Sequence, residues 1–276
     1  MALLAEIFSH PFLIRAAIAG TLIALCASVL GVSLVLKRYA MLGDGLSHVG
    51  FGAMAVGIAL GLAPLAVAMP VVLATAFLLL RLRESNKVRG DSAIALVSTG
   101  SLAIGVLALG QTAGVGGIHQ FMFGSILAVT TADVYWGVAL SAVVLPFFVL
   151  FFKQIFALTY DESFARTTGA KVGAYNTLLA LLTAMTVVLG MRLMGALLIS
   201  SLLVFPALSA IGLCRTFRSV VTAAAIISVV CFFAGLIASF QLNLPVGPSV
   251  TVLNLIVFVT LRGIKFARQF GAVSVL

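Results

Sequence analysis

Two side chains that can bind a metal ion lie four residues apart in a stretch that otherwise has the composition of a membrane helix. They are Asp44 and His48, within GDGLSHVGFG at 43–52. This spacing places both on one face of a helix, where a carboxylate and an imidazole form half of a transition-metal site. The alternative is structural: Asp44 caps the helix and pairs with Lys37 or Arg38, and His48 is a core histidine. Because ionisable groups within a membrane span are costly and usually functional, we favour the metal site.

Two ligands are too few for a tetrahedral zinc ion or an octahedral manganese ion. A symmetric dimer that brings both pairs to its axis would supply four protein ligands. We expect the flanking glycines to let neighbouring helices approach closely; these are Gly43, Gly45, Gly50 and Gly52. A second chemical role is open, in which the pair relays protons in a transporter that is driven by an ion gradient.

The composition indicates a polytopic membrane protein. Of 276 residues, 63% are hydrophobic and 8% are charged, whereas soluble domains average about 25% charged residues. The net charge of +9 comes from short clusters of Lys and Arg between apolar runs, so a nucleic-acid interface is not indicated. The three cysteines lack CxxC spacing and indicate neither a disulfide framework nor a zinc knuckle.

The apolar runs predict an all-α fold with nine membrane spans, or eight if one short run is re-entrant. No soluble domain interrupts them, so we expect a single transmembrane domain over residues 1–276. The predicted spans cover about residues 16–36, 41–62, 64–80, 92–113, 132–152, 174–191, 193–213, 219–240 and 246–261.

The basic residues predict the orientation of these spans. If the nine spans alternate in direction, all but one of the basic clusters fall on one side, which the positive-inside rule makes cytoplasmic. The N-terminus is then outside and the C-terminus inside, and Arg192 is the exception, at an outer turn. The clusters are Lys37 with Arg38, 81–89, Lys153 with Arg166 and Lys171, 215–218, and 262–268.

The predicted inner side carries two polar stretches. YDESFARTTGAKVG at 160–173 is either a solvated loop or a docking surface for a cytoplasmic partner. IGLCRTFRSV at 211–220 is basic and contains Phe217, as expected of a small helix that inserts into a groove of a partner. The sequence has no GxxxxGK[ST] motif, so energy for transport would come from an ion gradient or from another subunit.

Five motifs, taken in order, resemble the integral membrane permease of bacterial ABC importers for zinc and manganese. They are LKRYAMLGDGLSHVGFGAMAVG (36–57), FMFGSILAVT (121–130), DESFARTTGA (161–170), MGALLISSLLVFPALSA (194–210) and LPVGPSV (244–250). The resemblance implies a compact relative of the siderophore and cobalamin permease fold, in the plasma membrane of a bacterium and in contact with lipid. It also implies a dimer of two copies of this chain, which binds two cytoplasmic ABC ATPase subunits and receives metal from an extracytoplasmic metal-binding protein.

The family's Asp-x-x-x-His metal pair falls on Asp44 and His48. His119 lies just before the FMFGS motif on the outer side, where it either passes metal inward, contacts the binding protein, or is an incidental surface residue. The family's ATPase-coupling segment maps onto Cys214, Arg215, Thr216, Phe217, Arg218 and Ser219, within 211–220.

The resemblance therefore predicts import of a divalent metal by alternating access, with zinc favoured and manganese next. The metal is cargo, no cofactor is permanently bound, and ATP hydrolysis takes place in a separate subunit, so the chain itself is not an enzyme. Two alternatives are a gradient-driven secondary metal transporter and an ABC permease for a metal chelate. A chelate needs a roomy cavity and gains little from an Asp/His pair.

Overall fold

The computed structural model describes residues 11–84, 90–112, 122–124 and 129–273, and this part of the chain is helical without any strand. Long apolar runs form helices because a helix satisfies its internal backbone N–H and C=O groups without water. The predicted all-α fold is confirmed. The helices are α2 (Pro11–Leu36), α3 (Ala40–Ala59), α4 (Pro64–Glu84), α5 (Gly90–Thr112), α7 (Thr131–Leu150), α8 (Phe152–Tyr160), α9 (Glu162–Thr167), α10 (Val172–Met194), α11 (Ala196–Leu213), α12 (Phe217–Leu242) and α13 (Val246–Val273).

Eight helices of the described chain are long and apolar enough to cross a membrane: α2, α4, α5, α7, α10, α11, α12 and α13. The ninth predicted span is α3, which has 20 residues and is therefore about 30 Å long. Asp44 and His48 lower its mean hydropathy, because both side chains are polar. The count of eight thus leaves out the helix that carries the candidate metal pair, whereas the eight-span alternative from the sequence rested on a short re-entrant run.

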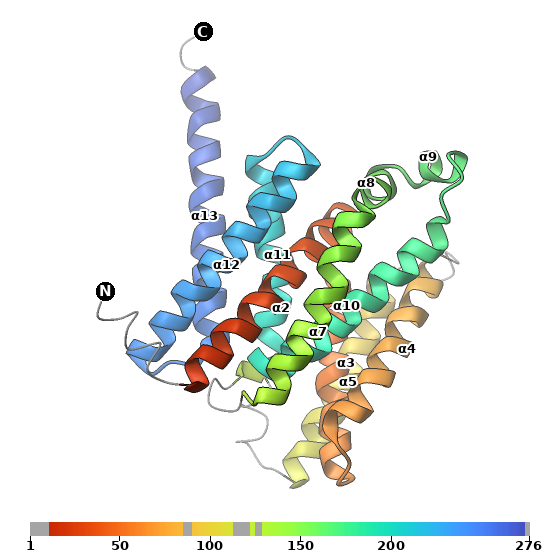
Figure 1. The fold of residues 1–276 in the computed structure, drawn as a ribbon, viewed down its shortest axis with the longest axis vertical. Helices are drawn as coiled ribbons and strands as arrows, with labels where there is room; N and C mark the ends of the chain where they lie inside the picture. Colours follow the sequence, from red (N-terminus) through yellow and green to blue (C-terminus); the bar gives the residue numbers. More distant parts are fainter. Residues whose placement is uncertain (1–10, 85–89, 113–121, 125–128, 274–276) are drawn as a thin grey trace.

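Successive long helices alternate in direction, and this gathers the basic residues at one end of the bundle, called the basic end below. Figure 1 shows α8, α9, the connection from α11 to α12 and the C-terminal part of α13 at this end. Lys37, which follows α2, forms an ion pair with Glu162 of α9 at the same end. The guanidinium group of Arg262 in α13 lies beside Gly212, near the end of α11.

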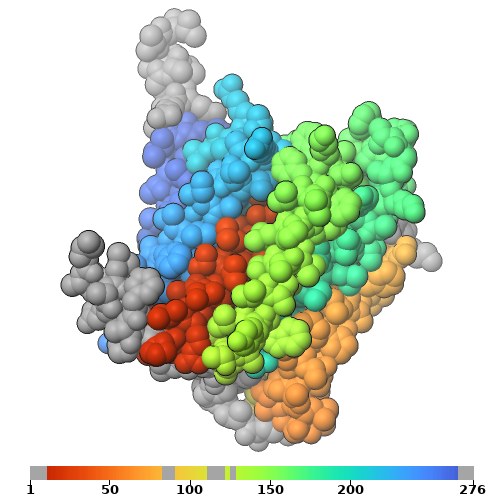
Figure 2. Space-filling model, in the orientation of Figure 1, coloured from red at the N-terminus to blue at the C-terminus, as the bar shows by residue number. Residues whose placement is uncertain are grey.

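Burial separates the central helices from the peripheral ones. In α2 and α10, 72% of the most apolar stretch is buried inside the bundle, against 11% in α13. On the face shown in Figure 2, α12, α2 and α7 run side by side. α7 and α12 expose large apolar side chains, among them Val149 and Leu150 of α7 and Ile226 and Val230 of α12. Exposure of so large an apolar surface to water is unfavourable, so this surface is suited to contact with the lipid bilayer.

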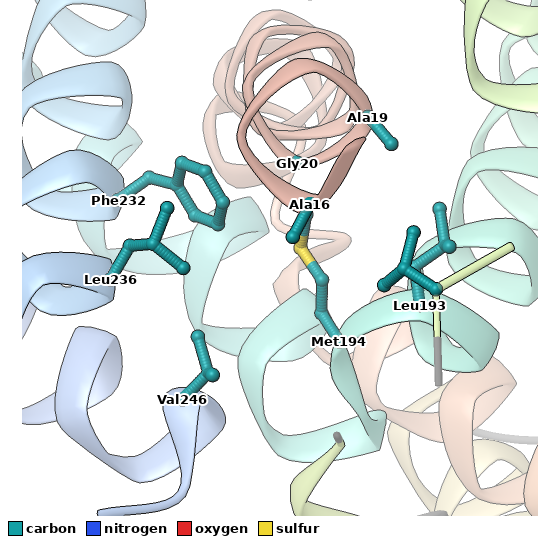
Figure 3. Close-up of a pocket in the computed structure, with 9 residues that line it drawn as sticks. Ala16, Ala19, Gly20, Leu193, Met194, Phe232, Leu236 and Val246 are labelled. Atoms are coloured by element: carbon teal, nitrogen blue, oxygen red, sulfur yellow. The ribbon is translucent and has the colours of Figure 1, made fainter. Parts of the chain in front are cut away.

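The interior between the helices is closely packed. A cavity of about 20 Å³ lies between α2, α10, α12 and α13, and its walls are apolar. Figure 3 shows Gly20 and Ala16 of α2 facing Phe232 of α12 and Met194 of α10 around it. A space of this size and polarity offers no ligand for a metal ion.

Candidate functional site

Asp44 and His48 lie on one face of α3, as their spacing predicts. His48 Nε2 is 3.7 Å from Asp44 Oδ2, and the two side chains are 27% and 44% exposed, respectively. Their neighbours Leu46, Ser47 and Val49 are buried. The helix is therefore held in the bundle on its other faces, while the carboxylate and the imidazole stay accessible.

The separation of the two donor atoms is compatible with a single metal ion. Zinc lies about 2.0–2.1 Å from imidazole nitrogen and about 2.0–2.2 Å from carboxylate oxygen, so one nitrogen and one oxygen ligand of the same ion are at most about 4.3 Å apart. At 3.7 Å, Nε2 and Oδ2 meet this limit. No group of three or more His, Cys, Asp or Glu side chains that could hold a metal occurs among the described residues. Within the described residues, Asp44 and His48 are thus a pair of candidate ligands, and a complete coordination shell would need ligands from another chain or from water.

Ser47 fixes the helix turn that separates the two ligands. Its hydroxyl donates to the carbonyl oxygen of Asp44, at 2.7 Å, and lies 3.1 Å from the hydroxyl of Ser200 in α11. Ser47 is completely buried. This contact holds α3 against α11 next to the metal pair.

The flanking glycines allow close contact with three different helices. A Cβ atom at Gly43 would meet Leu203 of α11, and one at Gly50 would meet Met191 of α10. At Gly45 and Gly52 it would meet Ile94 and the backbone of Ser101, both in α5. The expectation of close helix contact is confirmed. At each of these glycines, the absence of a side chain lets one neighbouring helix approach α3.

One part of the structural alternative for Asp44 is wrong, because Asp44 does not cap α3. The N-cap of α3 is Tyr39, without a side-chain hydrogen bond, and Asp44 lies in the second turn. Lys37 pairs with Glu162 of α9, 2.8 Å away. The sequence did not reveal this partner, because 125 positions separate the two residues.

At the end of the bundle opposite the basic end, three of the five motifs meet at glycines. Gly195 has φ of 87° and makes the turn from α10 to α11, which is why α10 extends to Met194, beyond its predicted end. A Cβ atom at Gly195 would lie 2.5 Å from the backbone nitrogen of Gly124. One at Gly247 would lie 2.6 Å from the carbonyl oxygen of Phe123. Larger residues at these positions would separate the connections.

Arg192, the exception in the predicted charge pattern, has a partner at this end. Its Nε atom is 3.1 Å from Oδ1 of Asp133, the side chain of which is only 5% exposed. Asp133 also accepts hydrogen bonds from the backbone N–H and the hydroxyl of Thr130, and so completes the capping box of α7. Arg192 is thus balanced by a buried carboxylate from another helix, and Asp133 was not singled out by the sequence pattern.

The predicted coupling segment at 214–219 is a turn followed by the start of a long helix, and not a separate small helix. α11 ends at Leu213, and Thr216 and Ser219 form the capping box of α12. Cys214 is half-buried, and Arg215 and Arg218 are exposed.

Phe217 does not project from this segment. Its side chain is only 4% exposed, and its ring lies 5.2 Å from that of Phe152 and 5.4 Å from that of Phe156, both in α8. Phe148 of α7 and Tyr160 of α8 complete the ring cluster. In this conformation the Phe217 ring itself is not available to a partner, whereas contact of the segment 211–220 with a partner stays a prediction. Phe217 instead connects the start of α12 to α8.

The polar stretch at 160–173 forms α9 and the turns around it. Asp161 caps α9 by accepting hydrogen bonds from the backbone N–H groups of Ser163 and Phe164. The rings of Tyr160 and Phe164 are each 59% exposed. A groove of about 650 Å³ lies between α8, the turn after α9 and the start of α10, with Lys153 and Lys171 among the residues that line it. This part of the basic end offers exposed aromatic rings and positive charge to a partner.

Glu162 joins this surface to the membrane helices. Burial of its carboxyl group acts to raise its pKa, but hydrogen bonds and charge from Lys37, with help from Asn176 and Arg166, bring the pKa below its ordinary value. Glu162 is therefore ionised near neutral pH. The predicted outer-side residue, His119, lies outside the described residues.

The comparison with protein families gives one match that covers most of the chain. The model described as "ABC 3 transport family" matches residues 9–263. Among curated proteins, the chain is 30% identical over 249 residues to the high-affinity zinc uptake system membrane protein ZnuB of Haemophilus influenzae, covering 90% of this chain and 95% of that protein. It is 24% identical over 247 residues to the manganese import system permease protein ScaB of Streptococcus gordonii, covering 90% and 89%.

A solved structure has the same architecture. PsaBC from Streptococcus pneumoniae, determined in complex with a Fab, superimposes with a TM-score of 0.84 at 25% sequence identity, covering 94% of each chain.

Proposed function

The chain belongs to the ABC 3 transport family, and we propose that it is the membrane permease of an ATP-driven importer that carries zinc, or next manganese, into the cell. The observation that carries the proposal is the pair of Asp44 and His48, accessible on one face of an otherwise buried helix. Relatives named for zinc uptake and for manganese import support a divalent metal as cargo.

We propose that the metal passes between two copies of this chain. One copy supplies one carboxylate and one imidazole, so two copies related by symmetry supply four ligands, enough for tetrahedral zinc. Imidazole and carboxylate suit zinc, and further oxygen ligands or water would suit manganese. In the alternating-access cycle, α3 would expose the pair first to one side of the membrane and then to the other.

The basic end supports a cytoplasmic location with an ATPase bound there. Positive residues collect on the cytoplasmic side of membrane proteins, and we therefore propose that the N-terminus lies outside and the C-terminus inside. We propose that α8, α9 and the segment 214–219 together form the contact with the ATPase subunits. Phe217 supports this combined surface, because its ring packs on Phe152 and Phe156 and links the two segments. An extracytoplasmic metal-binding protein would dock on the opposite end.

Uptake by the complete transporter in liposomes tests the metal site. We expect Asp44→Asn and His48→Ala each to reduce uptake of zinc and manganese at least about tenfold, as loss of a metal ligand does. Asp91→Asn is the control, because Asp91 is an exposed acidic residue in the first turn of α5. Near-normal uptake by both site variants, with normal folding, would refute the assignment of the site.

The same preparation separates the other transport mechanisms. Metal uptake without any ATPase subunit would indicate a gradient-driven transporter, with Asp44 and His48 as a proton relay. Uptake of a metal chelate that does not change in His48→Ala would indicate a chelate permease. Strict dependence on ATP together with loss of free-metal uptake in both variants is the result that we expect.

A further inference from the structure

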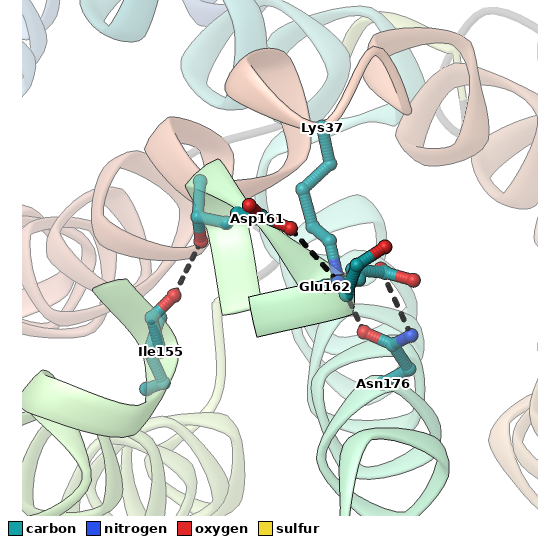
Figure 4. Close-up of polar contacts among 7 residues, drawn as sticks. Lys37, Ile155, Asp161, Glu162 and Asn176 are labelled. Atoms are coloured by element: carbon teal, nitrogen blue, oxygen red, sulfur yellow. Dashed lines mark hydrogen bonds and ion pairs between the residues drawn. The ribbon is translucent and has the colours of Figure 1, made fainter. Parts of the chain in front are cut away.

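Three polar side chains from three elements form a closed network at the basic end. The ammonium group of Lys37, after α2, is 2.8 Å from the carboxylate of Glu162 in α9 and donates a hydrogen bond to Oδ1 of Asn176 in α10. The amide nitrogen of Asn176 donates to Glu162 Oε1, at 3.2 Å. Figure 4 shows the three side chains converging from these elements. Each group thus bonds to both of the others.

Burial makes this network hard to separate. The side chain of Lys37 is only 6% exposed, and Asn176 is 5% exposed. A buried ammonium group without its carboxylate is strongly unfavourable, so Lys37 and Glu162 must move together or find other partners. The network therefore fastens the short helix α9 to the membrane helices.

Lys37 also lies in the short, hydrogen-bonded connection that joins α2 to α3, the helix that carries Asp44 and His48. Arg38 has φ of 60°, and the backbone N–H of Tyr39 donates to the carbonyl oxygen of Leu34, at 2.7 Å. The ammonium group of Lys37 lies 5.7 Å from the centre of the Tyr39 ring, and Tyr39 is the N-cap of α3. From Ala40, the first residue of α3, to Asp44 is about 6 Å along the helix axis. A displacement of Lys37 would thus be passed to the start of α3.

We propose that Lys37 is a positioning residue of the transport cycle, which couples the movement of α9 to α3 and so to the Asp44 and His48 pair. This inference rests on the proposed function, in which α9 contacts the ATPase. Lys37 touches neither the metal nor ATP in this role. Its removal should separate ATP hydrolysis from metal movement while leaving both binding sites intact.

The test uses the complete transporter in liposomes, with zinc and manganese ions measured separately. We expect Lys37→Met and Glu162→Gln to lower metal uptake per ATP hydrolysed about tenfold, a typical size for coupling between two sites. ATP hydrolysis should stay within about twofold of wild type, and zinc affinity of the permease should not change. Lys265→Met is the control, since Lys265 is an exposed lysine of α13, beyond Arg262.

Exchange of the two charges distinguishes coupling from a general loss of stability. Asn176 offers one acceptor and one donor, so a rotation of its amide can serve Lys37→Glu combined with Glu162→Lys. We expect this double variant to recover most of the uptake per ATP. Lys37→Met should fold even if Glu162→Gln does not, because it leaves unpaired only the carboxylate of Glu162, which is 37% exposed, whereas Glu162→Gln leaves the ammonium group of Lys37 buried without a carboxylate.

Three results would overturn the inference: unchanged uptake per ATP in Lys37→Met, a proportional fall of uptake and hydrolysis, or weaker zinc binding. Failure of the proposed function gives a different result, because the wild-type transporter itself would then show no ATP-dependent metal uptake.

Discussion

One added methyl group at Gly52 should move α3, the helix that carries Asp44 and His48, away from α5. A Cβ atom there would lie 2.4 Å from the carbonyl oxygen of Ser101 and 3.0 Å from its carbonyl carbon, in α5. Both are backbone atoms, so no side chain can rotate away. A shift of about 0.6 Å would bring Cβ only to 3.0 Å from the oxygen, which is still a tight contact. Gly52→Ala therefore requires α3 and α5 to separate.

The expected cost follows from this displacement. Overpacking of a close interface costs about 1–3 kcal/mol, and the better helix propensity of alanine returns up to about 1 kcal/mol. A net loss of about 1–2 kcal/mol lowers Tm by roughly 3–6 °C in a protein of this size. Gly52 is one turn from His48, and metal sites tolerate displacements of about 0.2 Å, so we also expect about tenfold weaker zinc binding.

Thermal unfolding in detergent and zinc titration of the same samples measure both effects. The matched control is Gly100→Ala in α5, where an added Cβ meets no atom within 4 Å. This control should be neutral or slightly stabilising, because the substitution only improves helix propensity. If Gly52→Ala had the Tm and zinc affinity of Gly100→Ala, the inferred close packing of α3 on α5 would be refuted.

Three further predictions concern other contacts. Arg192→Leu should destabilise the protein by about 2–3 kcal/mol, since it leaves the buried Asp133 carboxylate without its ion pair, and adding Asp133→Asn should recover part of the loss in Tm. Because the pKa of Glu162 is lowered, its contribution to stability is complete above the ordinary pKa of about 4.3 and is lost as the pH falls through the lowered value; Tm of wild type should therefore fall more than Tm of Glu162→Gln between about pH 6 and pH 3. Phe217→Ala should cost about 3–5 kcal/mol by leaving a cavity among the rings, whereas Phe217→Leu should cost clearly less, and equal unfolding temperatures would contradict the packing.

The sequence predicted most of the spans because length and apolarity are local properties of the chain. It also predicted the shared face of Asp44 and His48, which depends only on helical periodicity. The boundaries failed where a single residue decided them, as at Gly195, whose positive φ reverses the chain at once. The expectation of a separate small helix at 211–220 was wrong, and the inward direction of the Phe217 ring was not predicted, because a basic, exposed segment can still direct one ring into the protein.

By itself, the sequence determined that the chain is a helical membrane protein, and that one helix carries a carboxylate and an imidazole one turn apart. Only the tertiary structure decided which distant groups meet: Lys37 with Glu162 and Asn176 at the basic end, and Arg192 with Asp133 at the opposite end. The physical reason is that periodicity fixes which residues share a helix face, whereas the partner of that face depends on how helices far apart in the sequence pack together.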